Sequence, residues 1–206
     1  MPQSRTFNSK QIAFISAFIA IGAVVRIGID EVAMVSPDTL YGIIIAVGLS
    51  ENLSFVGGVM FGPVAGFITG FSIILLSDIA IAPGPWTPFI ASIIGLLGMC
   101  GGVLHYFRRE PTMRLMLVSA VPLTLLSEFL QNTWVSLTFN TPIAATMLTG
   151  LPTLISALAN NMILFPTVGY KTIRFLQNQV ALQNHRDATN GGTEDLKDQV
   201  TFGAPV

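Results

Sequence analysis

Apolar residues in this chain gather in long runs that are separated by short polar, glycine or proline segments. Six runs are visible, at about residues 11–29, 40–61, 63–80, 88–105, 115–137 and 152–176. Each is close to the roughly 20 apolar residues that a helix needs to cross the hydrocarbon core of a bilayer. The pattern therefore predicts an all-α membrane protein, with six transmembrane helices in one bundle formed by residues 1–176.

The distribution of basic residues predicts the orientation of these spans. In the six-span arrangement one side carries most of the positive charge: Arg5, Lys10, Arg108, Arg109, Arg114, Lys171 and Arg174. No lysine or arginine occurs between Arg26 and Arg108. Because cytoplasmic loops are rich in lysine and arginine, both termini are predicted to be cytoplasmic. Residues 177–206 are polar without an apolar period, so we expect a disordered cytoplasmic tail there.

The composition agrees with a multi-pass protein of the cell membrane. Hydrophobic residues make up 51% of the chain and charged residues only 10%, whereas about a quarter of an average soluble domain is charged. The spans leave no room for a catalytic ATPase domain. A net charge of -1 without a basic patch excludes nucleic acid as a partner. The single cysteine, Cys100, excludes an internal disulfide, and no cofactor or metal site is expected.

Two breaks divide the central part of the chain. Gly62 and Pro63 interrupt an apolar stretch and predict a tight turn between two spans, since proline cannot continue a helix. The loop from Ile81 to Thr87 contains a Pro-Gly-Pro-Trp sequence. Trp86 in this loop either lies over an outward cavity or anchors the loop at the membrane interface. Asp78 ends the third span and is expected to be solvated or to cap the helix.

Two further connections follow from polar and breaker residues. Acidic residues are expected between the first and second spans: Asp30, Glu31 and Asp38. Arg26 precedes Asp30 by one helical turn, where opposite charges can pair and anchor the segment at the interface. Asn140, Pro142 and Gly150 predict a loop over residues 139–150. Pro152 then suits the first turn of the sixth helix.

Polar residues inside the predicted spans are the candidate binding residues. Glu51 and Asn52 interrupt the second span, and a carboxylate at this depth indicates a functional site, a buried ion pair or a protonated packing group. In the fifth span Glu128, Gln131 and Asn132 share one helix face. They are expected to contact a ligand or to form a structural network.

Aromatic and amide side chains extend this set of candidates. Trp134 follows the polar face of the fifth span, and Asn160 and Asn161 are expected about two turns into the sixth. Buried amides need partners, which a neighbouring helix or a ligand can supply. In the first span Ala13 and Ala17 stand four residues apart, so another helix can approach closely there, from the same subunit or from a partner.

Three segments carry a resemblance to a known family: GVMFGPVAGFITGF, APGPWTPFIASIIGLLG and NTWVSLTFNTP. This spacing of glycines, prolines and aromatics resembles the substrate-binding S components of energy-coupling factor (ECF) vitamin importers, and in looser form it covers residues 10–176. The resemblance implies a capture subunit without catalysis that works with a transmembrane coupling protein and two ATPases in membrane lipid. Ala13 and Ala17 match the alanine pair that docks S components onto the coupling protein.

The predicted function is therefore the capture of a vitamin-like small molecule from outside the cell, with no enzymatic activity. The predicted binding residues come from the loop after the third span and from three helices: Glu51, Asn52, Trp86, Glu128, Gln131, Asn132, Trp134, Asn160 and Asn161. Two alternatives remain at this stage. One is an intramembrane enzyme that uses Glu51 and Glu128 as acid and base, although no HExxH or GxSxG motif is present. The other is a stand-alone carrier or channel.

Overall fold

A computed structural model describes residues 9–35, 40–107 and 111–179 of the chain. Over these residues the chain is almost entirely helical, and no β-strand occurs in the described part. The elements are α1 (Ser9–Val35), α2 (Leu40–Phe61), α3 (Pro63–Ile81), α4 (Thr87–Phe107), α5 (Met113–Phe139), α6 (Ile143–Leu164) and the π-helical segment η1 (Phe165–Gly169). The predicted all-α class is therefore confirmed for the described residues.

Five helical segments within the described residues are long and apolar enough to cross a membrane: Gln11–Gly28, Pro63–Ile81, Thr87–Leu104, Met113–Phe139 and Ile143–Gln179. They fit a multi-pass membrane protein. Near its middle, α2 carries the polar sequence Ser-Glu-Asn from Ser50 to Asn52.

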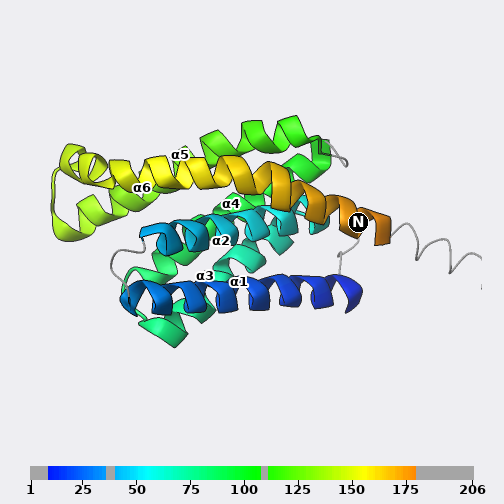
Figure 1. The fold of residues 1–206 in the computed structure, drawn as a ribbon, viewed down its shortest axis with the longest axis horizontal. Coiled ribbons are helices and arrows are strands. Elements are labelled where there is room, and N and C mark those ends of the chain that lie inside the picture. The colour runs from blue at the N-terminus through cyan, green and yellow to red at the C-terminus, as the bar shows by residue number, and fades with distance from the viewer. Residues whose placement is uncertain (1–8, 36–39, 108–110, 180–206) are drawn as a thin grey trace, which may run out of the picture. The chain divides into compact units, whose positions relative to one another are not determined.

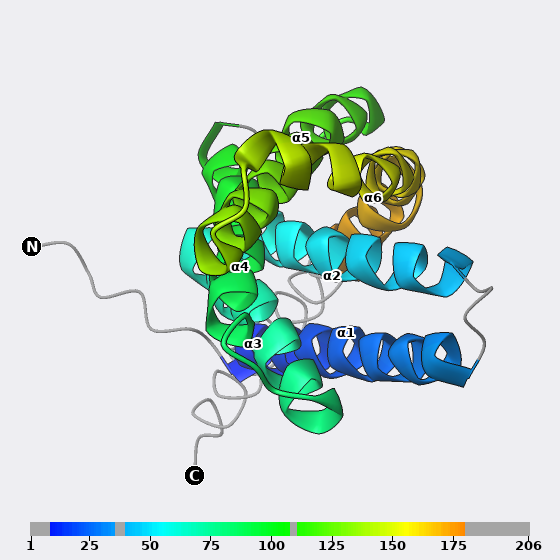
Figure 2. The same ribbon diagram turned by 90° about the vertical axis from the view of Figure 1, so that its left-hand side faces the viewer.

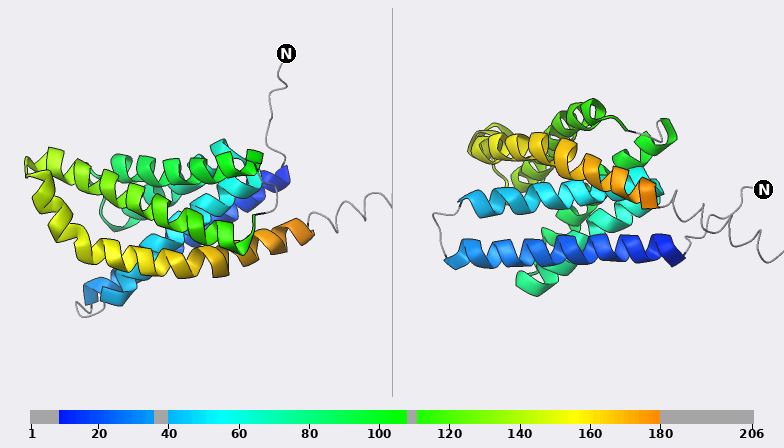
Figure 3. Two further views of the ribbon diagram at one scale, coloured as in Figure 1. Left: turned by 90° about the horizontal axis from the view of Figure 1, so that it is seen from above. Right: turned by 45° about the vertical axis from the view of Figure 1, so that its right-hand side comes forward.

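The chain divides into two compact units, Met1–Tyr170 and Lys171–Val206. Within the first unit α2 lies between α1 and α6, and α3 and α4 pack against each other and against α2 (Figure 1 and Figure 2). Helices α5 and α6 form a hairpin with a short connection (Figure 3). The second unit is described only over residues 171–179, which are helical.

Glycines bring the backbones of α2, α3 and α4 into close contact. A Cβ atom added to Gly66 would overlap the carbonyl group of Gly98, and one added to Gly58 would overlap the same carbonyl oxygen. The Ser54 hydroxyl crosses this junction, donating to the carbonyl oxygen of Ile94 at 2.9 Å. In lipid, close van der Waals packing replaces the hydrophobic effect between helices, so glycines at this junction hold the three helices together.

The turn between α2 and α3 forms as the sequence predicts. Gly62 has φ = 99°, a conformation that favours glycine, and Pro63 occupies the first turn of α3. The Gly62 N–H donates to the carbonyl oxygen of Gly58 at 2.8 Å, which satisfies the end of α2. Two helices can therefore follow each other without an intervening loop.

The prediction of a loop over residues 139–150 is wrong. Helix α5 ends at Phe139, Asn140 adopts a left-handed conformation, and α6 begins at Ile143. Gly150 and Pro152 consequently lie inside α6. Proline is tolerated within transmembrane helices because neighbouring groups can satisfy the freed carbonyl, and a helix satisfies the rest of its backbone in lipid.

The acidic residues after the first span are also placed differently from the prediction. Asp30 and Glu31 lie within α1, which continues to Val35, rather than in the connection. Arg26 forms an ion pair with Asp78 of α3, with 2.7 Å between Nη1 and Oδ1. Asp78 was predicted to be solvated or to cap the helix, and because it is only 4% exposed it is not solvated. Asp38, Arg5, Arg108, Arg109 and the tail from residue 180 lie outside the described residues.

Candidate ligand-binding site

Glu51 is the centre of a polar network that joins three helices. Its side chain is almost fully buried on α2. One carboxylate oxygen accepts a hydrogen bond from the Ser127 hydroxyl of α5 at 2.8 Å, and the other accepts one from the Asn161 amide of α6. These donors offset the cost of burying a carboxylate in an apolar surrounding. The network therefore fixes α2 against both helices of the α5–α6 hairpin.

The network continues through α5 on both sides of Glu51. The Asn161 amide nitrogen also donates to the Thr124 hydroxyl at 2.8 Å, and Gln131 donates to the Ser127 hydroxyl at 3.0 Å. Ser127 and Thr124 were not among the predicted candidates. They share a helix face with Gln131 at spacings of three and four residues, so this periodicity could have identified them.

Asn52 neighbours Glu51 but lies outside this network. It is completely buried, and within the described part of the chain neither its amide nitrogen nor its amide oxygen has a hydrogen-bond partner. The side chain packs where Gly169 of η1 leaves space, since a Cβ atom on that glycine would contact the Asn52 amide. The two predicted amides therefore have different surroundings: Asn161 bonds to Glu51, whereas Asn52 packs beside η1.

Two glycines make room for the amide side chains. A Cβ atom on Gly48 of α2 would collide with the amides of Asn160 and Asn161. A Cβ atom on Gly150 of α6 would meet the amide of Asn132 on α5. Gly150, which the sequence pattern assigned to a loop, instead allows α6 to lie against the polar part of α5.

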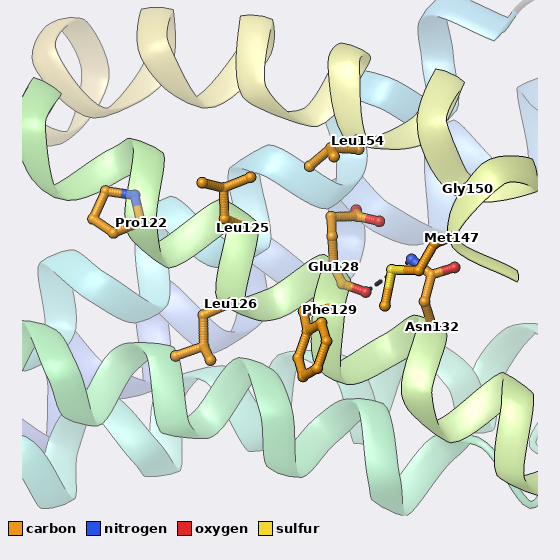
Figure 4. Close-up of a pocket in the computed structure, with 9 residues that line it drawn as sticks. All are labelled: Pro122, Leu125, Leu126, Glu128, Phe129, Asn132, Met147, Gly150 and Leu154. Atoms are coloured by element: carbon orange, nitrogen blue, oxygen red, sulfur yellow. Dashed lines mark hydrogen bonds between the residues drawn. The ribbon is translucent and has the colours of Figure 1, made fainter. Parts of the chain in front are cut away.

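A cavity of about 520 Å³ lies along the α5–α6 hairpin (Figure 4). Its lining residues come from both helices: Pro122, Leu125, Leu126, Glu128, Phe129, Asn132, Met147, Gly150 and Leu154. This volume falls within the roughly 300–1,000 Å³ that is typical of small-molecule sites. Apolar side chains with two polar residues among them also fit that type of site.

Glu128 is the charged residue of this cavity. Its side chain extends from α5 toward Leu154 of α6 (Figure 4). The residue is 7% exposed, yet among the described residues no donor forms a hydrogen bond with its carboxylate. Asn132, one turn further along, donates to the Glu128 backbone carbonyl at 2.8 Å. The two carboxylates therefore differ: protein groups satisfy Glu51, whereas Glu128 keeps its hydrogen-bonding capacity for another group.

Aromatic rings lie beyond the polar part of α5. Trp134 packs against Phe89 of α4, with 5.7 Å between ring centroids, and meets Phe139 edge-on. Trp86 is 39% exposed and lies over Gly84 of its own loop. That loop is held by Thr87, whose hydroxyl donates to Asp78 at 2.7 Å. Neither tryptophan lines the cavity described above.

The alanine pair of α1 lies on a separate surface. Ala13, Ser16 and Ala17 are all exposed. The opposite face of α1 is buried, with Ile15 and Phe18 turned toward the bundle. No cluster of histidine, cysteine, aspartate or glutamate suited to a metal ion occurs in residues 9–35, 40–107 and 111–179.

No protein-family model matches this sequence, and no curated protein matches it. A crystal structure of an S component of an ECF transporter is similar to this chain, with a TM-score of 0.60 and 16% sequence identity. The similarity covers 98% of this chain and 100% of the other. The chain therefore has the fold of an S component, and the resemblance seen in its glycine and proline pattern is confirmed at the level of the fold.

Proposed function

We propose that this protein is the membrane-embedded substrate-capture subunit of an ECF importer. In this proposal it crosses the cell membrane six times with both termini in the cytoplasm. It binds a vitamin-like small molecule from outside and releases it when a transmembrane coupling protein and two ATPases act on it. The observation that carries the proposal is a cavity of about 520 Å³ along the α5–α6 hairpin, with an unsatisfied carboxylate, Glu128, in a chain that has the S-component fold.

The polar network supports a binding role for this cavity. Glu128 and Asn132 are the groups we assign to direct ligand contact. Glu51 holds α2 to α5 and α6 through Ser127 and Asn161, and Gln131 donates to Ser127 within α5. A binding site needs such a rigid support because a group that moves freely loses conformational entropy on binding.

The remaining predicted residues take peripheral roles in the proposal. Trp86 and Trp134 form an aromatic rim at the ends of α4 and α5, where they stack against a flat ligand as it enters. Asn160 lies beside Gly48, and Asn52 lies near η1. In the proposal these two amides are polar groups where α2 meets α6 and η1, and they do not contact the ligand directly.

An intramembrane enzyme is less well supported. An acid and base pair requires both carboxylates to reach the substrate, but both oxygens of Glu51 are engaged with Ser127 and Asn161. Only Glu128 of the two lines the cavity. A carrier or channel that works alone is not favoured by any specific feature of the described helices.

The test begins with small molecules that remain bound during purification. Protein purified in mild detergent is denatured, and the released compounds are identified by mass spectrometry. The protein is then reconstituted in vesicles with its coupling protein and ATPases, and uptake of the identified compound is measured. We expect uptake that requires ATP and disappears when the ATPases carry a disabled catalytic residue. ATP-independent uptake, or no association with the coupling protein, would contradict the proposal.

A further inference from the structure

The cavity of the α5–α6 hairpin offers hydrogen-bond acceptors but few donors. Glu128 presents a carboxylate without a hydrogen-bond donor among the described residues. The Asn132 amide nitrogen is partly used, because it donates to the Glu128 backbone carbonyl at 2.8 Å. The amide oxygen of Asn132 remains as the second acceptor. Apart from these two residues, the lining consists of Pro, Leu, Phe, Met and Gly.

This lining also lacks a positive charge. None of the nine lining residues is lysine, arginine or histidine. In the sequence no lysine or arginine lies between Arg114 and Lys171, the interval that contains all nine lining residues. A ligand in the cavity consequently meets a carboxylate that no basic lining residue neutralises. Burial without a counter-charge disfavours the ionised form of Glu128, so a cationic ligand supplies the partner that this form needs, whereas an anionic ligand gains no attraction from Glu128 in either form.

We propose that the cavity selects a ligand with a protonated nitrogen on a compact apolar or aromatic body. This inference rests on the proposed function, because it names the ligand class of the same site. The ammonium or amidinium group of such a ligand donates to Glu128 and Asn132, and charge-assisted hydrogen bonds of this kind are stronger than neutral ones. The hydrocarbon body packs against Leu125, Phe129 and Leu154.

Phe129 contributes apolar surface to the cavity. Its ring points away from the Glu128 side chain in Figure 4, as expected for adjacent residues on a helix. The preference for a cation therefore comes from Glu128. An anion gains nothing from this group, and a neutral ligand satisfies it only through ordinary hydrogen bonds.

A matched set of three indoles tests this selectivity. Tryptamine is a cation at neutral pH, tryptophol is its neutral alcohol, and indole-3-acetate is an anion of similar size. Binding is measured on the full chain in detergent, after bound small molecules have been washed out, by calorimetry and by the rise in melting temperature. We expect tryptamine to bind at least tenfold more tightly than tryptophol, and indole-3-acetate to bind most weakly.

Three variants assign the selectivity to the cavity. Glu128→Gln should reduce the preference for tryptamine over tryptophol to less than threefold while keeping the shape of the side chain. Leu154→Trp should weaken all three indoles, because it fills the cavity from α6. Thr133→Ala is the matched control on α5, since the Thr133 hydroxyl bonds to the Phe129 backbone carbonyl and does not line the cavity. It should bind the three indoles as the wild type does.

The outcomes separate this inference from the proposed function. Tighter binding of indole-3-acetate, or an unchanged preference in Glu128→Gln, would overturn the cation selectivity and leave ATP-dependent capture intact. Equal and Glu128-independent binding of all three would show an apolar site without charge selectivity and would overturn the inference. No binding of any indole at millimolar concentration would also overturn it. Glu128→Gln is replaced as a test if it fails to fold. The inference is then supported if the wild type binds tryptamine most tightly and Leu154→Trp loses binding of all three indoles, and it is overturned by any other ranking. Failure of ATP-dependent uptake alone would overturn the proposed function and not the ranking of the indoles.

Discussion

Asn161 on α6 donates a hydrogen bond to the carboxylate of Glu51 on α2, although 110 residues separate them in sequence. The contact lies in the interior, since Glu51 is 1% exposed and Asn161 is completely buried. The contact connects α2, which packs against α3 and α4 through glycines, with the α5–α6 hairpin that carries the cavity. The arrangement of that hairpin therefore depends on a polar contact as well as on apolar packing.

Glu51→Ala should lower the free energy of unfolding by about 1–3 kcal/mol, because it leaves buried donors of Ser127 and Asn161 without their acceptor. Glu51→Gln should cost less, since the amide keeps the shape and one acceptor oxygen. Thermal unfolding of the ligand-free protein in detergent measures both values. Equal melting temperatures for the wild type and Glu51→Ala would show that the network does not support the fold.

Gly98→Ala should destabilise the bundle through overpacking, by about 1–3 kcal/mol. The added methyl group would overlap the Gly66 carbonyl and the Ser54 hydroxyl, so α3 and α4 must move apart. Gly28→Ala is the matched control on α1, where a Cβ atom meets nothing within 4 Å. It should raise stability by about 0.5–1 kcal/mol, because alanine loses less backbone entropy in a helix. A comparison of the two melting temperatures checks the prediction, which fails if both variants shift in the same direction.

Arg26 and Asp78 should show strong coupling in a double-mutant cycle. Arg26→Leu alone leaves a carboxylate that is 4% exposed without its counter-charge, which costs about 3–5 kcal/mol. Asp78→Leu alone should cost a similar amount, because it also removes the acceptor of the Thr87 hydroxyl. The double variant should be markedly more stable than the sum of the two losses predicts. Additive losses, measured by unfolding of the four proteins, would show that the pair contributes no interaction energy.

Ala13→Trp and Ala17→Trp should reduce ATP-dependent uptake at least tenfold in the reconstituted transporter. The physical reason is that a large side chain on this small-residue face prevents a second helix from approaching closely. Substrate binding by the isolated subunit should remain unchanged, because the cavity lies on α5 and α6. Val118→Trp, on an exposed part of α5, is the control and should retain uptake. Loss of binding and uptake together in the alanine variants would argue against a docking surface.

Much of the fold could be predicted from local patterns. Apolar runs located the helices, and the Gly62–Pro63 turn follows from the backbone preferences of those two residues. The connection between α5 and α6 was predicted too long, because Gly150 and Pro152 are breakers in water but lie inside α6 here. In lipid the helix satisfies its own backbone, so the surroundings override these local preferences.

The candidate site was predicted in part. The polar face of α5 was visible from the spacing of Glu128, Gln131 and Asn132, and Glu128 and Asn132 do line one cavity. The sequence could not show that Glu51 is satisfied by Ser127 and Asn161, since a hydrogen bond between distant helices has no local signature. Nor could it show that Asp78 is paired with Arg26 rather than solvated.

The sequence by itself determined the apolar helices, the tight turn at Gly62 and the small residues that permit close packing, because each depends on neighbours along the chain. Only the tertiary structure decided which buried carboxylate is satisfied and which faces a cavity. Glu51 and Glu128 have the same chemistry, and both interrupt apolar helices. Their difference comes from the donors that packing places around them: two reach Glu51, whereas none among the described residues reaches Glu128.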